Sequence, residues 1–309
     1  MDLRQLVAFV AVYEAGSINR AAQRLRVAQP SVSGIIRNLE EELGAQLFDR
    51  MARGTRPTPS GETFYRHCQR VLAEADAARQ AVAGDPDRLS GPIEAGLAPT
   101  AAKGLVPKFL GGFLAEHPDV QVRIAEAFSG PLTEWTLSGE VDFAVVAVPP
   151  IDRRLTIRRI ASEPIVLVAA AGKGRKSGAP LRLSQKPPLN LVLPSPRNGL
   201  RTIIDSYIHA NDVPVARSIE IDSLHGMLEF VKRSDWMTLL SVTAIGNELE
   251  RGEIAVHAIE PPLELGFYLI HPARRVLSAA ATRFIERLEA GFTASRQDWE
   301  RRVSRRQTP

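Results

Sequence analysis

Residues 27–44 read VAQPSVSGIIRNLEEELG and have the pattern of an amphipathic helix. Pro30 stands in the first turn, where a proline is tolerated, and apolar residues at Ile36, Leu39 and Leu43 recur at helical spacing. Glycine lowers helix stability by about 1 kcal/mol relative to alanine, so an ordinary solvent-facing surface gains nothing from Gly34. The opposite stripe is small and uncharged, and it consists of Ser31, Gly34, Ile35 and Asn38. The pattern predicts a helix whose backbone a partner can approach closely.

The residues before this helix predict two more helices. Apolar side chains recur at helical spacing from Leu3 to Tyr13, and Gly16 ends that segment. Ser17 is placed to cap a short helix over 18–25 through its hydroxyl, and Ala21 and Ala22 let another helix cross closely. A short break at 26–28 follows. Two helices joined by a tight break predict a helix-turn-helix.

A small basic hairpin is predicted after Gly44. Residues 47–48 and 55–56 have an extended pattern around Gly54, and three arginines, Arg50, Arg53 and Arg56, fall within the segment. Their position beside the helix favours a DNA-binding wing, with plain solubility as the alternative.

A long helix over 58–82 comes next, with Thr58 as its cap and Pro59 at its first position. Its apolar or small residues alternate in steps of four and three, which predicts pairing with a second helix in a dimer. Packing on its own domain is the alternative. For Cys68 the prediction is a small core residue, with a cross-dimer disulfide as a lesser alternative. The predicted seam consists of Phe64, Cys68, Val71, Ala75, Ala78 and Val82.

The breaker-rich run 84–92, GDPDRLSGP, marks a domain boundary. Beyond it, extended apolar runs alternate with helical stretches, which predicts an α/β domain with largely parallel sheets and two sub-domains around a cleft. The predicted strands are 93–97, 120–127, 141–148, 165–170, 189–193, 237–240 and 265–270, and the predicted helices are 101–116, 199–210, 223–233, 243–251 and 277–291.

Composition limits the class of protein. The chain has 309 residues, 44% of them hydrophobic and 24% charged, as in an ordinary globular protein. It has one cysteine and neither a signal peptide nor an apolar run long enough to span a membrane, so we expect a cytoplasmic protein. A net charge of +4 permits nucleic-acid binding, and residues 1–102 carry arginine but no lysine. The basic end, 295–309, is expected to be a frayed, solvated tail.

No sequence motif for catalysis or metal binding is present, and the histidines lack ligand spacing, so we expect no enzyme, no metal and no cofactor. Polar residues do stand at strand-to-helix junctions, where free backbone N–H groups attract a small anion. Ordinary helix caps are the alternative explanation. The candidate effector residues are Thr100, Ser129, Arg197, Asn198, Gly199, Arg201 and Ser223.

These residues together resemble the LysR-type transcriptional regulators. The N-terminal resemblance lies in DLRQL (2–6), GS (16–17), AA (21–22), AQPSVS (28–33), LEEELG (39–44), QLFDR (46–50) and TPSG (58–61). Looser matches follow in GPI (91–93), HPDV (117–120), GEVDF (139–143) and IEIDS (219–223).

The resemblance implies a winged helix-turn-helix over 1–58, a dimerising linker over 59–90 and an effector domain over 91–294. That domain is expected to have the two-lobed α/β fold of type 2 periplasmic binding proteins, with lobe I near 91–162 and 268–294 and lobe II near 163–267. It also implies a homotetramer, built as a dimer of dimers, that binds double-stranded promoter DNA. A small effector, favoured here to be a carboxylate, then changes promoter activity, and RNA polymerase is a candidate partner. The alternative is a constitutive regulator whose cleft is non-functional.

Residues of the DNA-reading helix and wing carry over by position. Two depart from the family, which usually has a basic residue at Gly34 and a polar one at Ile35. The small face would let the helix approach the major groove, where Ile35 meets a thymine methyl. The candidate DNA-binding residues are Gln29, Pro30, Ser31, Ser33, Gly34, Ile35, Arg37, Asn38, Arg50, Arg53 and Arg56.

Overall fold

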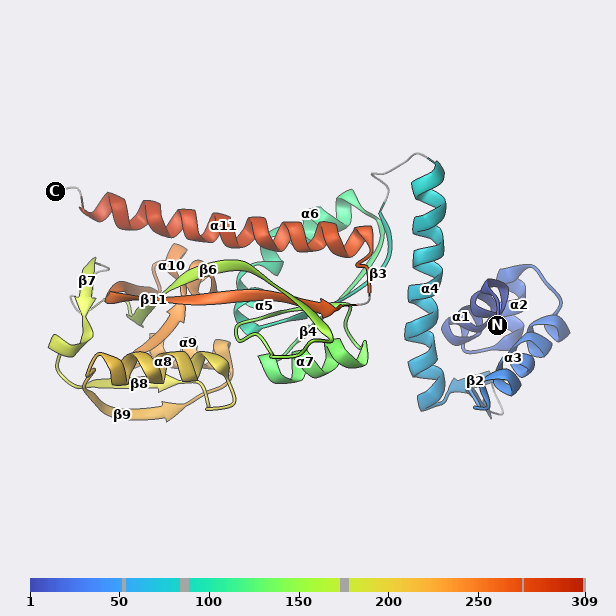
Figure 1. Ribbon diagram of the computed structural model, residues 1–309, viewed down its shortest axis with the longest axis horizontal. Coiled ribbons are helices and arrows are strands. Elements are labelled where there is room, and N and C mark those ends of the chain that lie inside the picture. The colour runs from blue at the N-terminus through green and yellow to red at the C-terminus, as the bar shows by residue number, and fades with distance from the viewer. Residues whose placement is uncertain (52–53, 84–88, 173–177, 274, 308–309) are drawn as a thin grey trace. The chain divides into compact units, whose positions relative to one another are not determined.

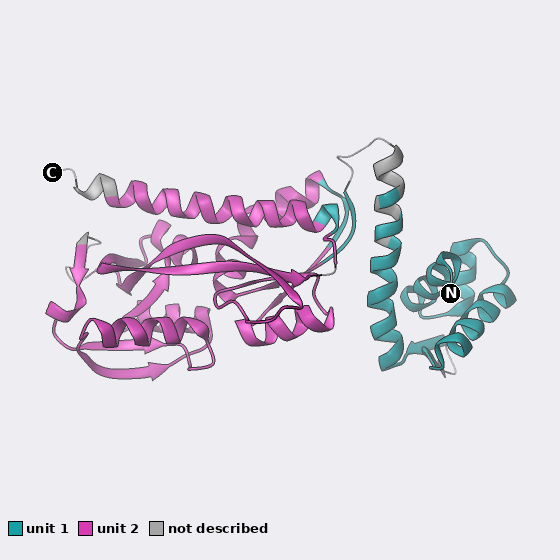
Figure 2. Cartoon of the chain, in the orientation of Figure 1, with its two compact units in different colours: residues 1–93, 117–121, 278–280 teal, residues 94–116, 122–277, 281–309 magenta. Residues whose placement is uncertain are grey.

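The computed structural model describes residues 1–51, 54–83, 89–172, 178–273 and 275–307. The chain divides into two compact units, which Figure 2 colours separately. Unit 1 comprises 1–93, 117–121 and 278–280, and unit 2 comprises 94–116, 122–277 and 281–309.

Unit 1 is a small helical domain with a two-stranded hairpin (Figure 1). An Asp2–Gln5 capping box starts the first helix, and Gly16 ends it in the left-handed conformation at φ 59°. The predicted hydroxyl cap at Ser17 is wrong, because the Ser17 side chain makes no capping bond. The elements are α1 (Leu3–Ala15), α2 (Ile18–Leu25), α3 (Gln29–Leu43), β1 (Phe48–Met51), β2 (Gly54–Pro57) and α4 (Pro59–Ala83).

The predicted helix-turn-helix is confirmed. Ala21 and Ala22 of α2 are buried where α1 and α3 pack, and Val32, Ile36 and Leu39 form the buried face of α3. Leu43 was predicted to share this face but is 39% exposed, because α3 ends immediately after it at Gly44.

The hairpin is fastened to the end of α1. Strands β1 and β2 pair antiparallel, with Phe48 opposite Pro57. The Thr55 N–H donates to the Gly16 carbonyl at 3.0 Å, and a Cβ on Gly54, which has φ 113°, would stand 2.5 Å from that same oxygen. Gly54 is therefore required by a close backbone approach as well as by its dihedral angle.

The start of α4 follows the sequence prediction. The Thr58 hydroxyl oxygen accepts the Gly61 N–H at 3.0 Å, and Pro59 is the first helical residue. Thr58 also fixes the start of α4 to the segment before the hairpin, because its hydroxyl donates to the Gln46 carbonyl at 2.7 Å.

Unit 2 is built on a mixed sheet with strand order β10-β6-β11-β5-β3-β4, and β7 pairs with β11. A second, parallel pair, β8 with β9, lies next to β10 through the Leu191–Met237 bridge. The strands are β3 (Ser90–Leu97), β4 (Asp119–Glu126), β5 (Phe143–Val146), β6 (Leu155–Ala170), β7 (Gly178–Arg182), β8 (Leu189–Leu193), β9 (Val215–Glu220), β10 (Thr238–Ser241) and β11 (Ile254–Pro272).

Helices of unit 2 lie on both sides of the long strands β6 and β11 (Figure 1). Ring contacts between Phe109, Phe113, Phe143 and Phe284, with centroids 5.1–6.5 Å apart, form the core between α6, β5 and α11. The helices are α5 (Pro99–Gly104), α6 (Val106–Glu116), α7 (Ser129–Ser138), α8 (Gly199–Ala210), α9 (Leu224–Lys232), α10 (Val242–Glu250) and α11 (Ala279–Gln307), with a short 3-10 turn at Leu183–Gln185.

The prediction of largely parallel sheets is wrong for the main sheet, which is mixed, although the β8–β9 pair is parallel. Strands β6 and β11 are much longer than predicted and pair antiparallel, from Ile254–Ala170 to Pro272–Leu155. The pairs β10–β6 and β11–β5 are antiparallel as well, whereas β3–β5 is parallel. The polar first half of β6 gave no apolar signal, so the prediction caught only its buried end.

Two predicted helices have different bounds. The predicted helix 101–116 is broken at Leu105, because Gly104 packs against the Thr243 carbonyl and Pro107 lies in the first turn of a new helix. The predicted helix 277–291 instead runs to Gln307 as part of α11. The frayed tail expected at 295–309 is thus wrong as far as Gln307, since Trp299 is buried and the Arg296 guanidinium donates to the Ser162 carbonyl at 2.7 Å.

Candidate nucleic-acid interface and ligand site

The candidate reading face of α3 is open to solvent. Apart from the backbone of α3 itself, none of the described residues lies within 4 Å of the position that a Cβ on Gly34 would take. The glycine is therefore not required by packing inside the protein. Gln29, Pro30, Ser31, Arg37 and Asn38 are exposed, and Ser33, Gly34 and Ile35 are half-buried.

Arginines border this face. The Arg37 side chain is 72% exposed and makes an i,i+4 ion pair with Glu41 at 3.6 Å. Arg56 is exposed in β2 opposite Asp49, and Arg50 lies in β1. Arg53 lies outside the described residues. These positions suit phosphate contacts beside a helix that reads base edges.

Two residues that the sequence prediction missed hold this surface in place. The Glu40 carboxylate of α3 accepts the backbone N–H groups of Leu47 and Phe48 at 2.8 and 3.1 Å, which fixes the wing to the reading helix. Arg26 forms the turn between α2 and α3 with a positive φ of 56°, an unusual conformation for a residue other than glycine. Glu40 looked like one of three equivalent acidic residues, 40–42, so no sequence signal separated it from the others.

The linker helix is joined to α1 by a polar and aromatic contact. Tyr65 stacks on Tyr13 with ring centroids 3.8 Å apart, and its hydroxyl donates to Glu14 at 3.1 Å. Burial, followed by the charge of Glu14, raises the pKa of Tyr65 to about 12, so the phenol stays neutral.

The predicted dimer seam of α4 divides into two parts. Phe64 packs on Phe9 with centroids 4.9 Å apart, as the alternative of packing on its own domain expected. Cys68 is buried in the core of unit 1, which confirms the prediction of a small core residue. Burial raises the pKa of the Cys68 thiol to about 12. Farther along, Val71 is 46% exposed, Ala75 is half-buried and Ala78 is exposed. Val82 lies in the last turn of α4, and its side chain is outside the described residues. Pairing through this second part stays a prediction.

In unit 2, Thr100 and Ser129 stand at one edge of the sheet. They follow β3 and β4, whose ends are joined by a hydrogen bond from the Ala127 N–H to the Leu97 carbonyl at 3.3 Å. Ser129 is the first residue of α7, and its hydroxyl accepts the Val148 N–H at 3.2 Å.

Asn198 and Ser223 stand at a second sheet edge, after β8 and β9. Each is a true cap, because Asn198 accepts the Leu200 N–H at 3.0 Å and Ser223 accepts the Gly226 N–H at 3.1 Å. The two strand ends are linked by the Ile221 N–H and Leu193 carbonyl at 2.9 Å. Both side chains thus have a structural role of their own.

Val148 connects the two edges. Gly199, the first residue of α8, packs so closely on the Val148 side chain that a Cβ would overlap it. Ser129 bonds the Val148 backbone from the other side, so the N-termini of α7 and α8 meet there. The hydroxyl oxygen of Ser195, just before α8, is buried and has no hydrogen-bond partner among the described residues.

The two arginines of this region differ. Arg201 is 17% exposed and bonded to Asp205 at 2.8 Å, Glu220 at 3.0 Å and the Pro194 carbonyl at 3.0 Å. These partners engage its guanidinium, and binding of a ligand by Arg201 stays a prediction. Arg197 is exposed, and no ion pair of its side chain occurs in the described part of the chain.

A buried glutamate lies where β6 passes α10. Glu163 is fully buried and accepts the Thr243 N–H at 3.3 Å on one oxygen and the Thr243 hydroxyl on the other. Burial raises the pKa of Glu163 to about 7, and the bonds from Thr243 oppose that rise. Nearby, Lys103 of α5 donates to the Ala244 carbonyl and to Glu248 of α10, both at 2.8 Å.

Two other kinds of feature are absent from the described ranges. No group of histidine, cysteine and acidic side chains could hold a metal ion there. Likewise, none of the described helices is long and apolar enough to cross a membrane.

The chain matches two family models. Residues 3–62 match the "Bacterial regulatory helix-turn-helix protein, lysR family" model, and residues 86–293 match the "LysR substrate binding domain" model.

Relatives and solved structures agree with these matches. The regulator CfxR of Cupriavidus necator is 30% identical over 91% of this chain and 89% of its own length. The regulator PcaQ of Agrobacterium fabrum is 28% identical over 84% of this chain and 85% of its own length. Among solved structures, the Corynebacterium glutamicum OxyR C206 mutant has a TM-score of 0.72 and 26% identity, with 95% of this chain and 93% of that chain covered. CbnR in complex with its target DNA shares the fold, with a TM-score of 0.52 at 24% identity over 94% of this chain and all of that one. The chain therefore belongs to the LysR family and is a transcriptional regulator with a helix-turn-helix and a substrate-binding domain.

Proposed function

We propose that this regulator binds promoter DNA through α3 and the wing, and that a small organic anion in the substrate-binding domain changes promoter activity. Residues 1–58 would bind DNA, 59–90 would pair two chains, and 91–294 would hold the effector. The observation that carries the DNA-binding part is the exposed, uncharged face of α3 around Gly34, bordered by Arg37 and Arg56. Such a face admits the helix backbone to the major groove while the arginines contact phosphate.

The effector part rests on the junction around Val148. The N-termini of α7 and α8 meet there, and helix N-termini attract anions. The Ser195 hydroxyl beside them supplies a donor that has no partner among the described residues. Arg197 is the free cation nearest in sequence, so a carboxylate is the favoured class. We propose assembly as a dimer of dimers, with RNA polymerase as a further partner at the promoter.

The test is a titration of the purified protein against labelled DNA from upstream of its own gene, at two salt concentrations, with nuclease footprinting. A protected region over several helical turns, interrupted about every 10 bp, supports a multimer docked on one face of the duplex. Uniform protection that vanishes at higher salt would instead mean that only phosphates are contacted.

A constitutive regulator is the second candidate. It is favoured by Arg201, whose guanidinium is occupied by Asp205 and Glu220. Thermal unfolding in the presence of a panel of organic acids separates the two candidates, because only a ligand that binds the folded state raises the melting temperature.

A further inference from the structure

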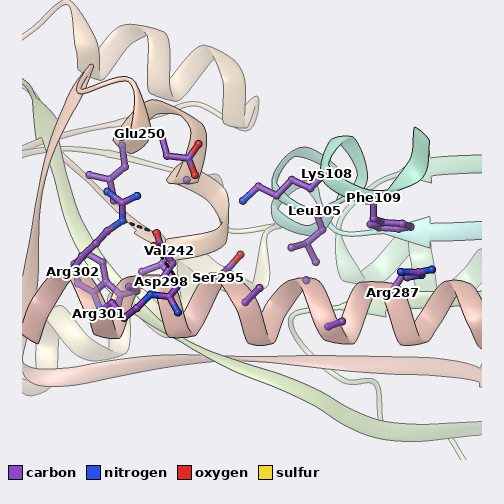
Figure 3. A pocket seen from close by; sticks show the side chains of 16 residues that line it. Leu105, Lys108, Phe109, Val242, Glu250, Arg287, Ser295, Asp298, Arg301 and Arg302 are labelled. Atoms are coloured by element: carbon purple, nitrogen blue, oxygen red, sulfur yellow. Dashed lines mark hydrogen bonds and ion pairs between the residues drawn. The ribbon is translucent and has the colours of Figure 1, made fainter. Parts of the chain in front are cut away.

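A pocket of about 430 Å³ lies among α6, α10 and α11, apart from the helix N-termini discussed above (Figure 3). Its volume falls in the range of about 300–1,000 Å³ that is typical of small-molecule sites. All of its walls belong to unit 2.

Small residues on α11 leave this space open. Ala290, Gly291 and Ala294 line the pocket where larger side chains would fill it. Gly291 is held small by its neighbour, because a Cβ there would stand 3.1 Å from the Leu105 side chain. The remaining apolar wall is made of Leu105, Phe109, Val242, Leu249 and Trp299.

More basic than acidic side chains line the pocket. Lys108, Arg287, Arg301 and Arg302 line it, against Glu250 and Asp298. The arginines are engaged, since Arg287 bonds Glu116, and Arg301 and Arg302 both bond Asp298.

Lys108 is the cation that remains. It extends from α6 toward α10, where a Cβ on Gly246 would lie 3.4 Å from its ammonium nitrogen (Figure 3). No ion pair or hydrogen bond of Lys108 occurs within the described ranges. An ammonium group above an apolar wall is suited to a ligand with one acidic group on a compact apolar body.

We propose that this pocket is a second ligand site, which binds an amphipathic organic anion. The apolar body would lie against Leu105, Phe109 and Trp299, and the acidic group would accept hydrogen bonds from Lys108. The site is independent of the proposed effector site at Val148, and each can fail without the other.

Two fluorescent probes of nearly the same shape test this proposal on the full chain. The first is 8-anilinonaphthalene-1-sulfonate, and the second is N-phenyl-1-naphthylamine, which lacks the sulfonate. Lys108→Ala is expected to lower the affinity for the sulfonate probe about tenfold, which corresponds to the loss of one charge-assisted hydrogen bond. The affinity for the neutral probe should stay nearly unchanged. Ala294→Trp is expected to weaken both probes, because Ala294 is exposed at the pocket and the larger ring fills it.

Lys186→Ala removes an exposed lysine outside the pocket lining and should not change probe binding. Circular dichroism shows that each variant is folded. Sulfonate binding that is unchanged in Lys108→Ala, or that falls equally in Lys186→Ala, overturns the proposal.

Discussion

Gly34 weakens α3, and a side chain added there would meet none of the described residues outside its own helix backbone. Because the space beside it is empty, an arginine there costs the fold little and adds a cation to the reading face. We expect Gly34→Arg to raise affinity for unrelated DNA, to steepen the salt dependence and to change base preference. Gel-shift titrations on specific and random duplexes measure all three quantities, with Gly34→Ala as the control that changes helix propensity alone. Unchanged binding in Gly34→Arg would place this residue outside the groove.

Glu163 gives the substrate-binding domain a dependence on pH. Its pKa is raised from 4.5 to about 7 in the folded protein, so the folded state holds a proton that the unfolded state releases. The stability that this bound proton contributes to folding is fully present below pH 4.5. It is lost as pH rises through about 7, where an ionised carboxylate must stay buried.

We therefore expect Glu163→Gln to lose less stability than the natural chain as pH rises from 4.5 to 8, with a difference on the order of 3 kcal/mol. Urea unfolding of both proteins at each pH measures it, and all other titrating groups are shared. Parallel stability curves for the two proteins would show that Glu163 does not titrate in this range.

At the scale of single elements, α4 has two faces with different tasks. Phe64 and Cys68 serve the core of unit 1, whereas Val71 is exposed farther along the helix. We expect Val71→Glu to dissociate the proposed dimer while unit 1 stays folded, because only the paired state buries this position. Sedimentation velocity measures the mass. Val215→Glu, a valine of similar exposure in β9, is the matched control and should leave the assembly intact.

The end of α11 is a structural part of unit 2. Trp299 is 8% exposed, so Trp299→Ala should lower the free energy of unfolding by about 3 kcal/mol. Gln297→Ala, an exposed neighbour in the same helix, should have no measurable effect. Chemical denaturation measures both. A loss below about 0.5 kcal/mol for Trp299→Ala would return this segment to the frayed tail that composition predicts.

Local patterns predicted the elements of unit 1 well, because caps and turns such as Thr58 with Pro59, or Gly16 and Gly44, act within a few residues. The long strands β6 and β11 were harder. Half of each is polar or half-buried, and their antiparallel register depends on partners about 100 residues away. For the same reason, Glu40 and Glu163 became visible as important residues only in three dimensions, through the backbone groups that they bond.

At the scale of the whole molecule, some arginine side chains are exposed and others are held in ion pairs. Arg37 and Arg56 of unit 1 are exposed, whereas Arg201 is bonded within the substrate-binding domain. Arg197 is the exception there. We expect Arg197→Ala to abolish the response of the DNA complex to an activating carboxylate, with affinity in its absence unchanged. Quantitative footprinting with and without that acid tests it, and a response that persists would remove Arg197 from the effector site.

The single cysteine makes this chain convenient for spectroscopy. Cys68 is buried and its thiol has a pKa of about 12, so maleimide dyes and nitroxide labels will not modify it at neutral pH. A cysteine introduced at any exposed position can then carry a label without first replacing the natural one. Pairs of such labels on two chains would report distances across the assembled regulator on its promoter.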